Sequence, residues 1–305
     1  MSGSTVSIII PNYNGARFVA EAVNCALLQT FSPLEIVVID DASKDQSEEI
    51  IRSTFTRELA NGRLRFERNE RNRERSFSRN RGAELARGEY ICFLDHDDLW
   101  SKEYIASVME IFERTSCDAV YSFPRTFVNE NGELIRRSAK RISADSAELI
   151  FASQVGYPSA TAFRRTSFLG YTEDCILRED WEIFLRGYLA GQHICIQDND
   201  VVKIRAHDGR TSNSVKFWSS TLRVYKQYLE RIPLQYRNIF LYHVVDVCLR
   251  YGDLPRGWHL SMMAMKSGML PDVRMIQRLF TRGIRVDRYL SLAAERRKFG
   301  AGDVP

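Results

Sequence analysis

The sequence predicts an α/β protein built on a mostly parallel β-sheet with helices on both faces. Three observations predict this class. Apolar runs rich in Val and Ile recur through the first half of the 305-residue chain, segments of helical periodicity separate them, and polar residues follow most of the runs. Strands that are apolar throughout are typical of parallel sheets buried on both faces. Strands that alternate with helices indicate parallel βα units.

Four strands and four helices are expected to alternate as far as Arg114. The strands are expected at Val6–Ile10, Glu35–Ile39, Leu64–Phe66 and Tyr90–Leu94. The helices are expected at Gly15–Gln29, from Ser43 to about Arg57, at Ser76–Arg87 and from about Ser101 to Arg114. Ser43 and Gln46 form a capping-box pattern, which predicts the start of the second helix.

The pattern changes after Cys117. A longer strand is expected at Asp118–Val128, a turn at Asn131 and Gly132, a helix at Glu179–Leu189, and short strands around Ile194 and Val201. Only helices are expected from about Val215, at Lys216–Arg231, Leu234–Tyr251, Arg256–Ser267, Asp272–Arg282 and Val286–Lys298. We place a domain boundary near Asn213, so that residues 1–213 form the α/β domain and residues 214–305 an all-helical region.

The composition limits the class of protein. Hydrophobic residues make up 44% and charged residues 27%, which excludes collagen-like, disordered and disulfide-scaffold proteins. The net charge of +4, from 43 basic and 39 acidic residues, is too small to predict nucleic-acid binding. The six scattered cysteines form no CxxC pattern and are expected to be reduced thiols. Without a signal-peptide or membrane-spanning pattern, a cytoplasmic protein is expected.

Acidic residues cluster after the fourth strand. Asp95, Asp97 and Asp98 lie within four residues of one another. Carboxylates this close repel each other unless a cation neutralises them. Mg²⁺ and Mn²⁺ prefer oxygen ligands, often carboxylates together with substrate phosphates. One such Asp alone would be explained as the cap of the next helix, but three favour a metal–phosphate site.

Two other strands end in polar groups. Asp40 and Asp41 could accept hydrogen bonds from a base imide or a ribose hydroxyl, since Ser43 already serves as the helix cap. Tyr13, after the first strand, could stack on a nucleobase, although a plain turn explains the same residues. Parallel sheets bind ligands at the carboxyl ends of their strands. We therefore expect one ligand site at this edge of the sheet.

Three further residues are candidates with structural alternatives. Asp180 could act as a general base, or it could simply complement the dipole of the helix that it opens. His207 could bind a metal or a phosphate, and an ordinary loop histidine explains it equally well. Nine arginines lie between Arg63 and Arg87, interleaved with glutamates, which is typical of an ion-paired surface. Among them, Arg79 is the candidate for binding a diphosphate.

Six segments carry a family resemblance. They are Val6–Gly15, Glu35–Asp45, Arg79–Ile91, the acidic motif Asp95-His96-Asp97-Asp98, Glu179–Arg186, and Arg205-Ala206-His207. In this order and spacing, over roughly residues 5–214, the chain resembles the family-2 glycosyltransferases, which have the GT-A fold. Ala42 stands where that family more commonly has Gly. The resemblance does not extend to the C-terminal helices.

The resemblance implies the inverting transfer of a sugar from a nucleotide-diphosphate donor. The donor would be UDP-, dTDP- or GDP-linked, and the acceptor would be a glycan or glycolipid hydroxyl in bacterial surface polysaccharide synthesis. The nucleotide-sugar site would comprise Pro11, Tyr13, Asn14, Asp40, Asp41, Arg79, Asp95 and His96. Mn²⁺ or Mg²⁺ would be bound by Asp97, Asp95 and His207, and Asp180 would deprotonate the acceptor hydroxyl.

Other functions compete with this interpretation. A nucleotidyltransferase that makes activated sugars would need a Gly-rich phosphate loop, for which Asn12–Gly15 is a poor match. A non-catalytic sugar-nucleotide binder would not require Asp97 and Asp180. A nucleic-acid binder would use the arginines, but acidic residues are interleaved with them and aromatic residues are few. No nucleic-acid partner is therefore expected.

The C-terminal region combines basic and apolar residues. The residues concerned are Arg274, Arg278, Arg282, Arg285, Arg288, Arg296 and Arg297, together with Met269, Met275, Ile276, Leu279 and Phe280. Core packing or a homo-oligomer face is the first explanation of this pattern. Peripheral attachment to the cytoplasmic face of an anionic inner membrane is the alternative.

Overall fold

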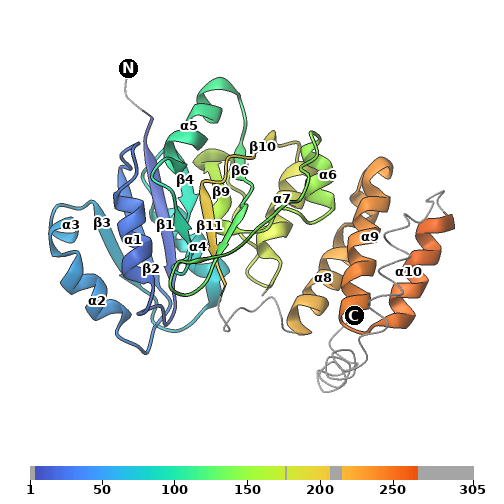
Figure 1. Cartoon of the computed structure of the whole chain (residues 1–305), viewed down its shortest axis with the longest axis horizontal. Helices are drawn as coiled ribbons and strands as arrows, with labels where there is room; N and C mark the ends of the chain where they lie inside the picture. The colour runs from blue at the N-terminus through green and yellow to red at the C-terminus, as the bar shows by residue number, and fades with distance from the viewer. Residues whose placement is uncertain (1–3, 176, 207–214, 267–305) are drawn as a thin grey trace. The chain divides into compact units, whose positions relative to one another are not determined.

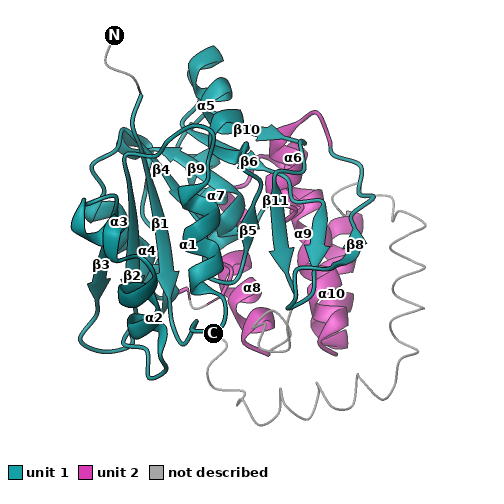
Figure 2. Ribbon diagram, turned by 60° about the vertical axis from the view of Figure 1, so that its left-hand side comes forward, with its two compact units in different colours: residues 1–142, 155–174, 179–209 teal, residues 143–154, 175–178, 210–305 magenta. Residues whose placement is uncertain are grey.

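The structure is a computed structural model that describes residues 4–175, 177–206 and 215–266. The chain forms two compact units (Figure 2). Unit 1 comprises Met1–Ile142, Val155–Asp174 and Glu179–Gly209. Unit 2 comprises Ser143–Gln154, Cys175–Arg178 and Arg210–Pro305. Two short segments from within the first 213 residues thus belong to the second unit.

Unit 1 is built on a seven-stranded sheet with the strand order β10-β6-β9-β4-β1-β2-β3 (Figure 1). Its strands are β1 (Val6–Asn12), β2 (Glu35–Asp40), β3 (Leu64–Arg68), β4 (Tyr90–Phe93), β6 (Ala119–Ser122), β9 (Thr161–Arg164) and β10 (Ile194–Gln197). All neighbouring strands are parallel except that β9 runs antiparallel to both β4 and β6. The predicted mostly parallel sheet is confirmed, and β9 is a strand that was not predicted.

Helices cover both faces of this sheet (Figure 1). They are α1 (Val19–Leu27), α2 (Ser47–Thr54), α3 (Thr56–Ala60), α4 (Glu74–Leu85), α5 (Tyr104–Arg114) and α7 (Glu179–Leu189). α1 and α4 pack against β1 and β2, whose apolar residues are buried. The prediction for α7 is confirmed to the residue. The second helix starts at Ser47 rather than Ser43, because the Ser43 side chain is bonded to Asp40 instead of capping a helix.

A second, four-stranded sheet of unit 1 has the order β5-β11-β7-β8. Its strands are β5 (Leu99–Trp100), β7 (Thr126–Val128), β8 (Leu134–Arg137) and β11 (Val202–Arg205). The turn predicted at Asn131 and Gly132 is confirmed, since it joins the antiparallel strands β7 and β8. The single strand predicted over Asp118–Val128 is wrong. The chain leaves the central sheet after Ser122 and enters the second sheet at Thr126, so the segment forms β6 and β7.

Unit 2 is helical in its described part. It contains α6 (Ser146–Phe151), α8 (Val215–Tyr228), α9 (Leu234–Arg250) and α10 (Leu254–Lys266). α9 packs against each of the other three helices, and Phe240, Val244 and Cys248 on α9 are fully buried. The helices expected at Asp272–Arg282 and Val286–Lys298 lie outside the described residues. Within the described residues, no helix combines the length and the apolar character needed to cross a membrane.

Candidate active site

Sheet topology brings three polar loops to one edge of the central sheet. β1 lies between β2 and β4 and is parallel to both, so all three strands end at the same edge. Asn12 pairs with Asp40 in the sheet register, and the Asp41 N–H donates to the Asn12 carbonyl at 2.7 Å. The candidate residues after these strands therefore lie on neighbouring loops, at the place where parallel sheets bind ligands.

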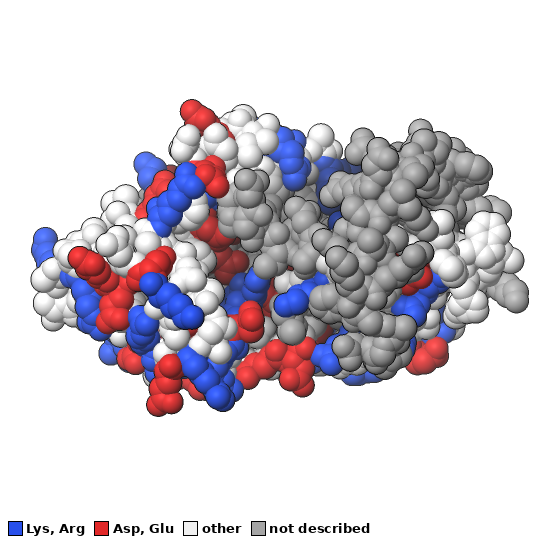
Figure 3. All heavy atoms as spheres, turned by 90° about the horizontal axis from the view of Figure 1, so that it is seen from below, with Lys and Arg blue, Asp and Glu red and all other residues white. Residues whose placement is uncertain are grey.

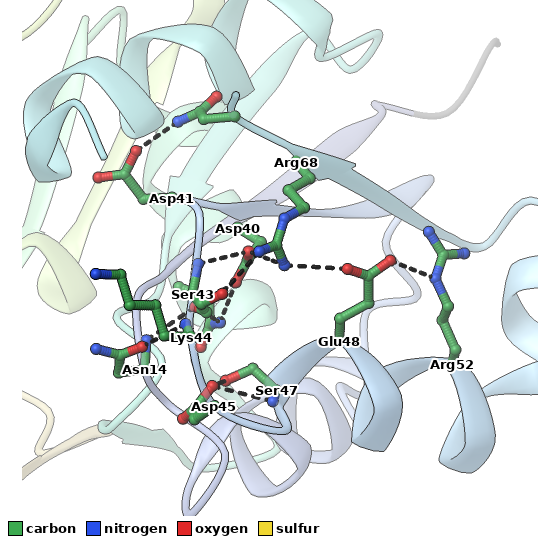
Figure 4. A network of polar contacts seen from close by, with 12 residues as sticks. Asn14, Asp40, Asp41, Ser43, Lys44, Asp45, Ser47, Glu48, Arg52 and Arg68 are labelled. Atoms are coloured by element: carbon green, nitrogen blue, oxygen red, sulfur yellow. Dashed lines mark hydrogen bonds and ion pairs between the residues drawn. The ribbon is translucent and has the colours of Figure 1, made fainter. Parts of the chain in front are cut away.

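The Asp40 carboxylate links the ends of β1 and β2 through its hydrogen bonds and its ion pair (Figure 4). It is fully buried, accepts from Asn12 Nδ2 at 2.8 Å and from the Ser43 N–H at 3.0 Å, and pairs with Arg68 at 3.0 Å. The chain turns here through Ala42, whose φ of 58° lies in the left-handed region. A glycine would adopt this conformation without a Cβ penalty, which explains why Gly is commoner at this position in the family that the sequence resembles.

The Asp41 side chain points away from Asp40 and the residues bonded to it (Figure 4). It accepts from Asn69 Nδ2 at 2.7 Å, and its two oxygens lie 3.0 and 3.1 Å from the Arg73 backbone nitrogen. These partners all come from the segment that links β3 to α4. The two neighbouring aspartates therefore have different surroundings: Asp40 is enclosed by its own loop, whereas Asp41 faces the segment that precedes α4.

The first loop packs against the acidic loop. A Cβ on Gly15 would collide with the Asn12 side chain and with the His96 imidazole, so the two loops meet at a place where only glycine fits. Beside this contact, the Asn14 N–H donates to Ser43 Oγ at 2.9 Å. The Tyr13 side chain is 42% exposed and is thus available for stacking. His96 thus lies beside the loop after β1, which carries the candidates Tyr13 and Asn14.

The acidic loop after β4 holds three carboxylates whose oxygens lie within 4.8 Å of one another. Asp98 is buried and is bound from both sides, by Ser159 Oγ at 2.6 Å and by the Arg205 N–H at 2.9 Å. Burial, together with repulsion from Asp97 and Asp95, raises the pKa of Asp98 well above its ordinary value. Asp98 therefore anchors the loop, while Asp95 and Asp97 are partly exposed.

A buried arginine joins the acidic loop to helix α7. Arg79, on α4, is 1% exposed; its guanidinium lies 2.7 Å from Asp95 Oδ1 and 3.0 Å from Glu179 Oε1. Burial lowers the pKa of Arg79, but Asp95 and Glu179 outweigh it and raise that pKa above its ordinary value. Arg79 was expected to bind a diphosphate. In the structure, both ends of its guanidinium are bonded to carboxylates.

Asp180 follows Glu179 at the start of α7. Its Oδ1 accepts from the Trp181 N–H at 2.8 Å. Its carboxylate lies against Gly156, where a Cβ would come within 3.4 Å of Oδ2. Because Glu179 is fixed by Arg79, the helix start that carries Asp180 is tied to the loop that carries Asp95. The predicted base and the predicted metal ligand Asp95 thus belong to one connected network.

Sequence reasoning missed two residues that shape the acidic loop. Ser159 receives a hydrogen bond from the Asp95 N–H at 3.0 Å and donates its own proton to Asp98. Arg205 is 2% exposed, and its Nε donates to the Asp97 carbonyl at 2.8 Å. The Arg-x-His motif pointed to Arg205 without giving it a role, whereas nothing in the sequence around Ser159 distinguishes it. His207, the third residue of that motif, lies outside the described residues.

The donor set fits a hard divalent cation. Asp98 is buried with a protein partner on each oxygen, whereas Asp95 and Asp97 are partly exposed, which makes these two the more accessible carboxylates for a metal. Arg79 binds one oxygen of Asp95. Clustered carboxylate oxygens are typical ligands of Mg²⁺ and Mn²⁺. His207 cannot be placed with them.

The arginines of the segment 63–87 are largely ion-paired. Seven of the nine pair with acidic side chains: Arg65, Arg68, Arg73, Arg75, Arg79, Arg81 and Arg87. On the face drawn in Figure 3, basic and acidic side chains intermingle over the end of unit 1 that carries α2, α3 and β3. This arrangement supports the interpretation as an ion-paired surface.

Comparison with known proteins extends these observations. A relative from Nostoc sp., named an uncharacterized glycosyltransferase, is 28% identical over 256 residues, which cover 78% of this chain and 76% of the relative. The amylovoran biosynthesis glycosyltransferase AmsB of Erwinia amylovora is 27% identical over 114 residues, which cover 37% of this chain and 38% of AmsB. The similarity to AmsB thus spans less than half of either protein.

Solved structures share the fold. The crystal structure of S. aureus TarS 1-349 in complex with UDP-GlcNAc matches with a TM-score of 0.67 at 18% identity, covering 96% of this chain and 92% of that chain. The mannosyltransferase PcManGT from Pyrobaculum calidifontis in complex with GDP-Man and Mn²⁺ matches with a TM-score of 0.65 at 16% identity, covering 97% of this chain and 85% of that chain. At these identities, the likeness concerns the fold.

The family assignment rests on the sequence itself. The family model described as "Glycosyl transferase family 2" matches residues 7–172, which contain the first loop, the aspartate pair after β2 and the acidic loop. The matched stretch covers more than half of the chain. The chain belongs to glycosyl transferase family 2 and has the GT-A fold.

Proposed function

We propose that this glycosyltransferase is metal-dependent and inverting, and that it moves a sugar from a nucleotide-diphosphate donor to a hydroxyl of a glycan or glycolipid. The observation that carries the proposal is the buried bridge Asp95–Arg79–Glu179. It ties the acidic loop, which suits a metal and a diphosphate, to the start of α7, which carries the proposed base Asp180. The bridge supports one site made from both parts.

The nucleotide is proposed to bind across the three loops. Asp41 is the candidate chosen for the base contact, because its side chain faces the segment before α4, whereas the Asp40 carboxylate is enclosed by Asn12, Ser43 and Arg68. Tyr13 would stack on the base, and Pro11, Asn14 and His96 would shape the pocket beside it. TarS and PcManGT were solved with UDP-GlcNAc and GDP-Man, which supports a UDP-, dTDP- or GDP-linked donor without choosing among them.

Asp95 and Asp97 would hold Mn²⁺ or Mg²⁺, and His207 remains a proposed third ligand. The Mn²⁺ of PcManGT and the carboxylate cluster of this chain support the assignment. When bound, such a cation neutralises charge on the departing diphosphate. Arg79 does not contact the diphosphate in this proposal. It orients the Asp95 carboxylate through the contact of 2.7 Å between the two side chains.

Asp180 is proposed to accept the proton of the acceptor hydroxyl. The oxygen attacks the anomeric carbon from the face opposite the leaving group, the new C–O bond forms, and the bond to the nucleotide diphosphate breaks. The configuration at that carbon is inverted, as in the base-assisted half of an inverting glycosidase. Gly156 leaves room beside the carboxylate, which suits the approach of an acceptor.

The acceptor is proposed to belong to bacterial surface polysaccharide synthesis. The name of AmsB, which refers to amylovoran biosynthesis, supports this class. A cytoplasmic enzyme that acts on a lipid-linked acceptor would work at the membrane surface. This is the reason for proposing a peripheral position on the cytoplasmic face.

Binding and transfer can be tested separately. In titration calorimetry, wild type should bind one of UDP-GlcNAc, dTDP-glucose or GDP-mannose more tightly with Mn²⁺ than with EDTA. Asp97→Ala should lose this metal dependence, whereas Asp180→Asn should keep it and lose transfer. Metal-independent binding in wild type would refute the metal site. Wild-type transfer rates in Asp180→Asn would refute the base assignment.

A further inference from the structure

We infer that helix α10 carries a docking surface for an anionic phospholipid bilayer. The surface, termed here the α10 stripe, consists of Leu254, Trp258, Met262 and Met265. The inference rests on the proposed function for its purpose, because a lipid-linked acceptor lies in a membrane.

The α10 stripe is a continuous exposed apolar row on α10, beside which Pro255, His259 and Met263 are exposed as well. Its residues follow one another at spacings of four, four and three, which places them on one helix face. They are between 38% and 65% exposed, and Trp258 is the most exposed of them. Leu260 and Ala264, on the opposite face, are buried, and α10 packs against α9.

A row of this kind differs from ordinary surface residues. Single exposed apolar side chains are common on folded proteins, whereas a contiguous apolar patch marks an interaction site. Its composition suits a lipid surface. Tryptophan is enriched at membrane–water interfaces, where its ring is buried and its N–H stays hydrated, and Leu and Met supply the apolar area of helices that lie in the interface.

The positive charge of the C-terminal segment favours an anionic partner for the α10 stripe. The segment from Leu254 to Pro271 contains Arg256 and Lys266 and no acidic residue, and Arg256 pairs with the preceding Asp253 at 3.6 Å. The segment from Leu254 to the C-terminus contains 10 Lys and Arg and 4 Asp and Glu, so its net charge is +6. Because the whole chain has a net charge of +4, the preceding 253 residues have a net charge of −2. A basic segment next to an apolar helix face is attracted to anionic headgroups by about 1 kcal/mol per Lys or Arg near the surface.

The same charges disfavour two other occupants of the α10 stripe. Residues 267–305 contain eight Lys and Arg and four Asp and Glu, so if they covered the stripe they would bring no net negative charge to it. A second copy docked through α10 would likewise bring together two C-terminal segments of the same net positive charge. Neither occupant offers a net negative charge. An anionic bilayer supplies both an apolar layer and negative charge.

The fluorescence of Trp258 can report binding of the α10 stripe to vesicles in the full-length protein. The other three tryptophans, Trp100, Trp181 and Trp218, are at most 5% exposed. A change in the emission maximum on adding vesicles therefore reports on Trp258. Vesicles of equal parts phosphatidylglycerol and phosphatidylcholine should shift the emission to the blue and should co-sediment with the protein, and vesicles of phosphatidylcholine alone should do neither. High salt should weaken binding.

Matched variants locate the contact. Met262→Ser/Met265→Ser keeps the reporter and should weaken binding to the anionic vesicles about tenfold. Leu28→Ser changes a side chain of unit 1 that is 71% exposed, and it should bind as wild type does. Trp258→Phe should abolish the emission shift while the protein still sediments. Unchanged thermal melting of each variant shows that it is folded.

Several results would overturn the inference. They are wild-type binding by the double Ser variant, equal binding to neutral vesicles, and no binding to either kind. A blue shift that grows with protein concentration without lipid, together with a dimer mass in light scattering, would show that a second copy covers the α10 stripe. Nucleotide-sugar binding, measured in parallel, should be unchanged in the double variant, so failure of the proposed function is seen separately.

Discussion

The guanidinium of Arg79 donates a hydrogen bond of 2.7 Å to the carboxylate of Asp95, although the first residue lies on α4 and the second follows β4. The opposite end of the same guanidinium binds Glu179 at 3.0 Å. Three charged groups are thus arranged with the cation in the middle. Removing one partner of such a buried set leaves uncompensated charge and typically costs about 3–5 kcal/mol.

Replacing Arg79 should damage both stability and transfer. Arg79→Lys keeps the charge but loses the planar fork that reaches two carboxylates at once. We expect the free energy of unfolding to fall by about 2–4 kcal/mol and kcat to fall by about 10- to 100-fold, because the acids on both sides lose their orientation. Urea unfolding and initial rates measure the two effects.

Arg71 supplies the control for this substitution. It is an exposed arginine of the same segment, and Arg71→Lys should change the free energy of unfolding by less than about 0.5 kcal/mol. If Arg79→Lys were as stable and as active as Arg71→Lys, the bridge would have no positioning role.

The two aspartates after β2 should respond differently to loss of charge. Asp40→Asn removes the charge of a buried carboxylate that pairs with Arg68, and it weakens the bonds within its loop, so it should lower the melting temperature. Asp41→Asn keeps an oxygen for its protein partners and should mainly weaken nucleotide affinity, by about tenfold if a base imide is its partner. Thermal melting and calorimetry with UDP separate these outcomes. The reverse pattern would assign the base contact to Asp40.

Gly156 should be required for access to Asp180. Its φ of 150° is unfavourable for other residues, and a Cβ would lie 3.4 Å from the Asp180 carboxylate. Gly156→Ala is therefore expected to lower kcat more than it lowers nucleotide affinity. Gly132→Ala is the matched control, because Gly132 also has a positive φ, of 81°, but has no atom within 4 Å of the added Cβ. Equal losses of kcat in both variants would assign the effect to backbone strain alone.

The buried Glu35 should make stability depend on acid pH. Burial raises the pKa of Glu35, but hydrogen bonds from the Arg87 N–H, Ser7 and Arg65 outweigh it and lower the pKa below its ordinary value of 4.5. A carboxylate with a lowered folded-state pKa stabilises the protein above its unfolded pKa. This contribution is lost as the pH falls through the folded-state pKa.

Glu35→Gln should therefore be less stable than wild type at pH 7, by about 2 kcal/mol. The difference between the two proteins should shrink as the pH falls below the ordinary value of 4.5. Urea unfolding at pH 7, 5 and 3 measures it. A difference that stayed constant over this range would show that Glu35 contributes packing rather than charge.

The sequence by itself determined the features of this protein that depend on neighbouring residues. β-branched runs predicted the first two strands, and the helix expected at Glu179–Leu189 matches α7 to the residue. The order of these elements, together with the parallel sheet that it implies, placed the aspartates after β2 and β4 at one edge. These inferences succeed because periodicity and strand propensity are local properties.

Only the tertiary structure decided what each charged group binds. β9 became a strand because β4 and β6 flank it on both sides, although the three segments are distant in the chain. Ser159 reaches Asp98 across 61 residues of sequence, and Arg79 reaches Glu179 across 100. Whether an arginine is an exposed ligand for phosphate or a buried bridge between acids depends on which segments fold around it. No local pattern encodes that choice, because burial and the positions of distant partners set the energy of a charge.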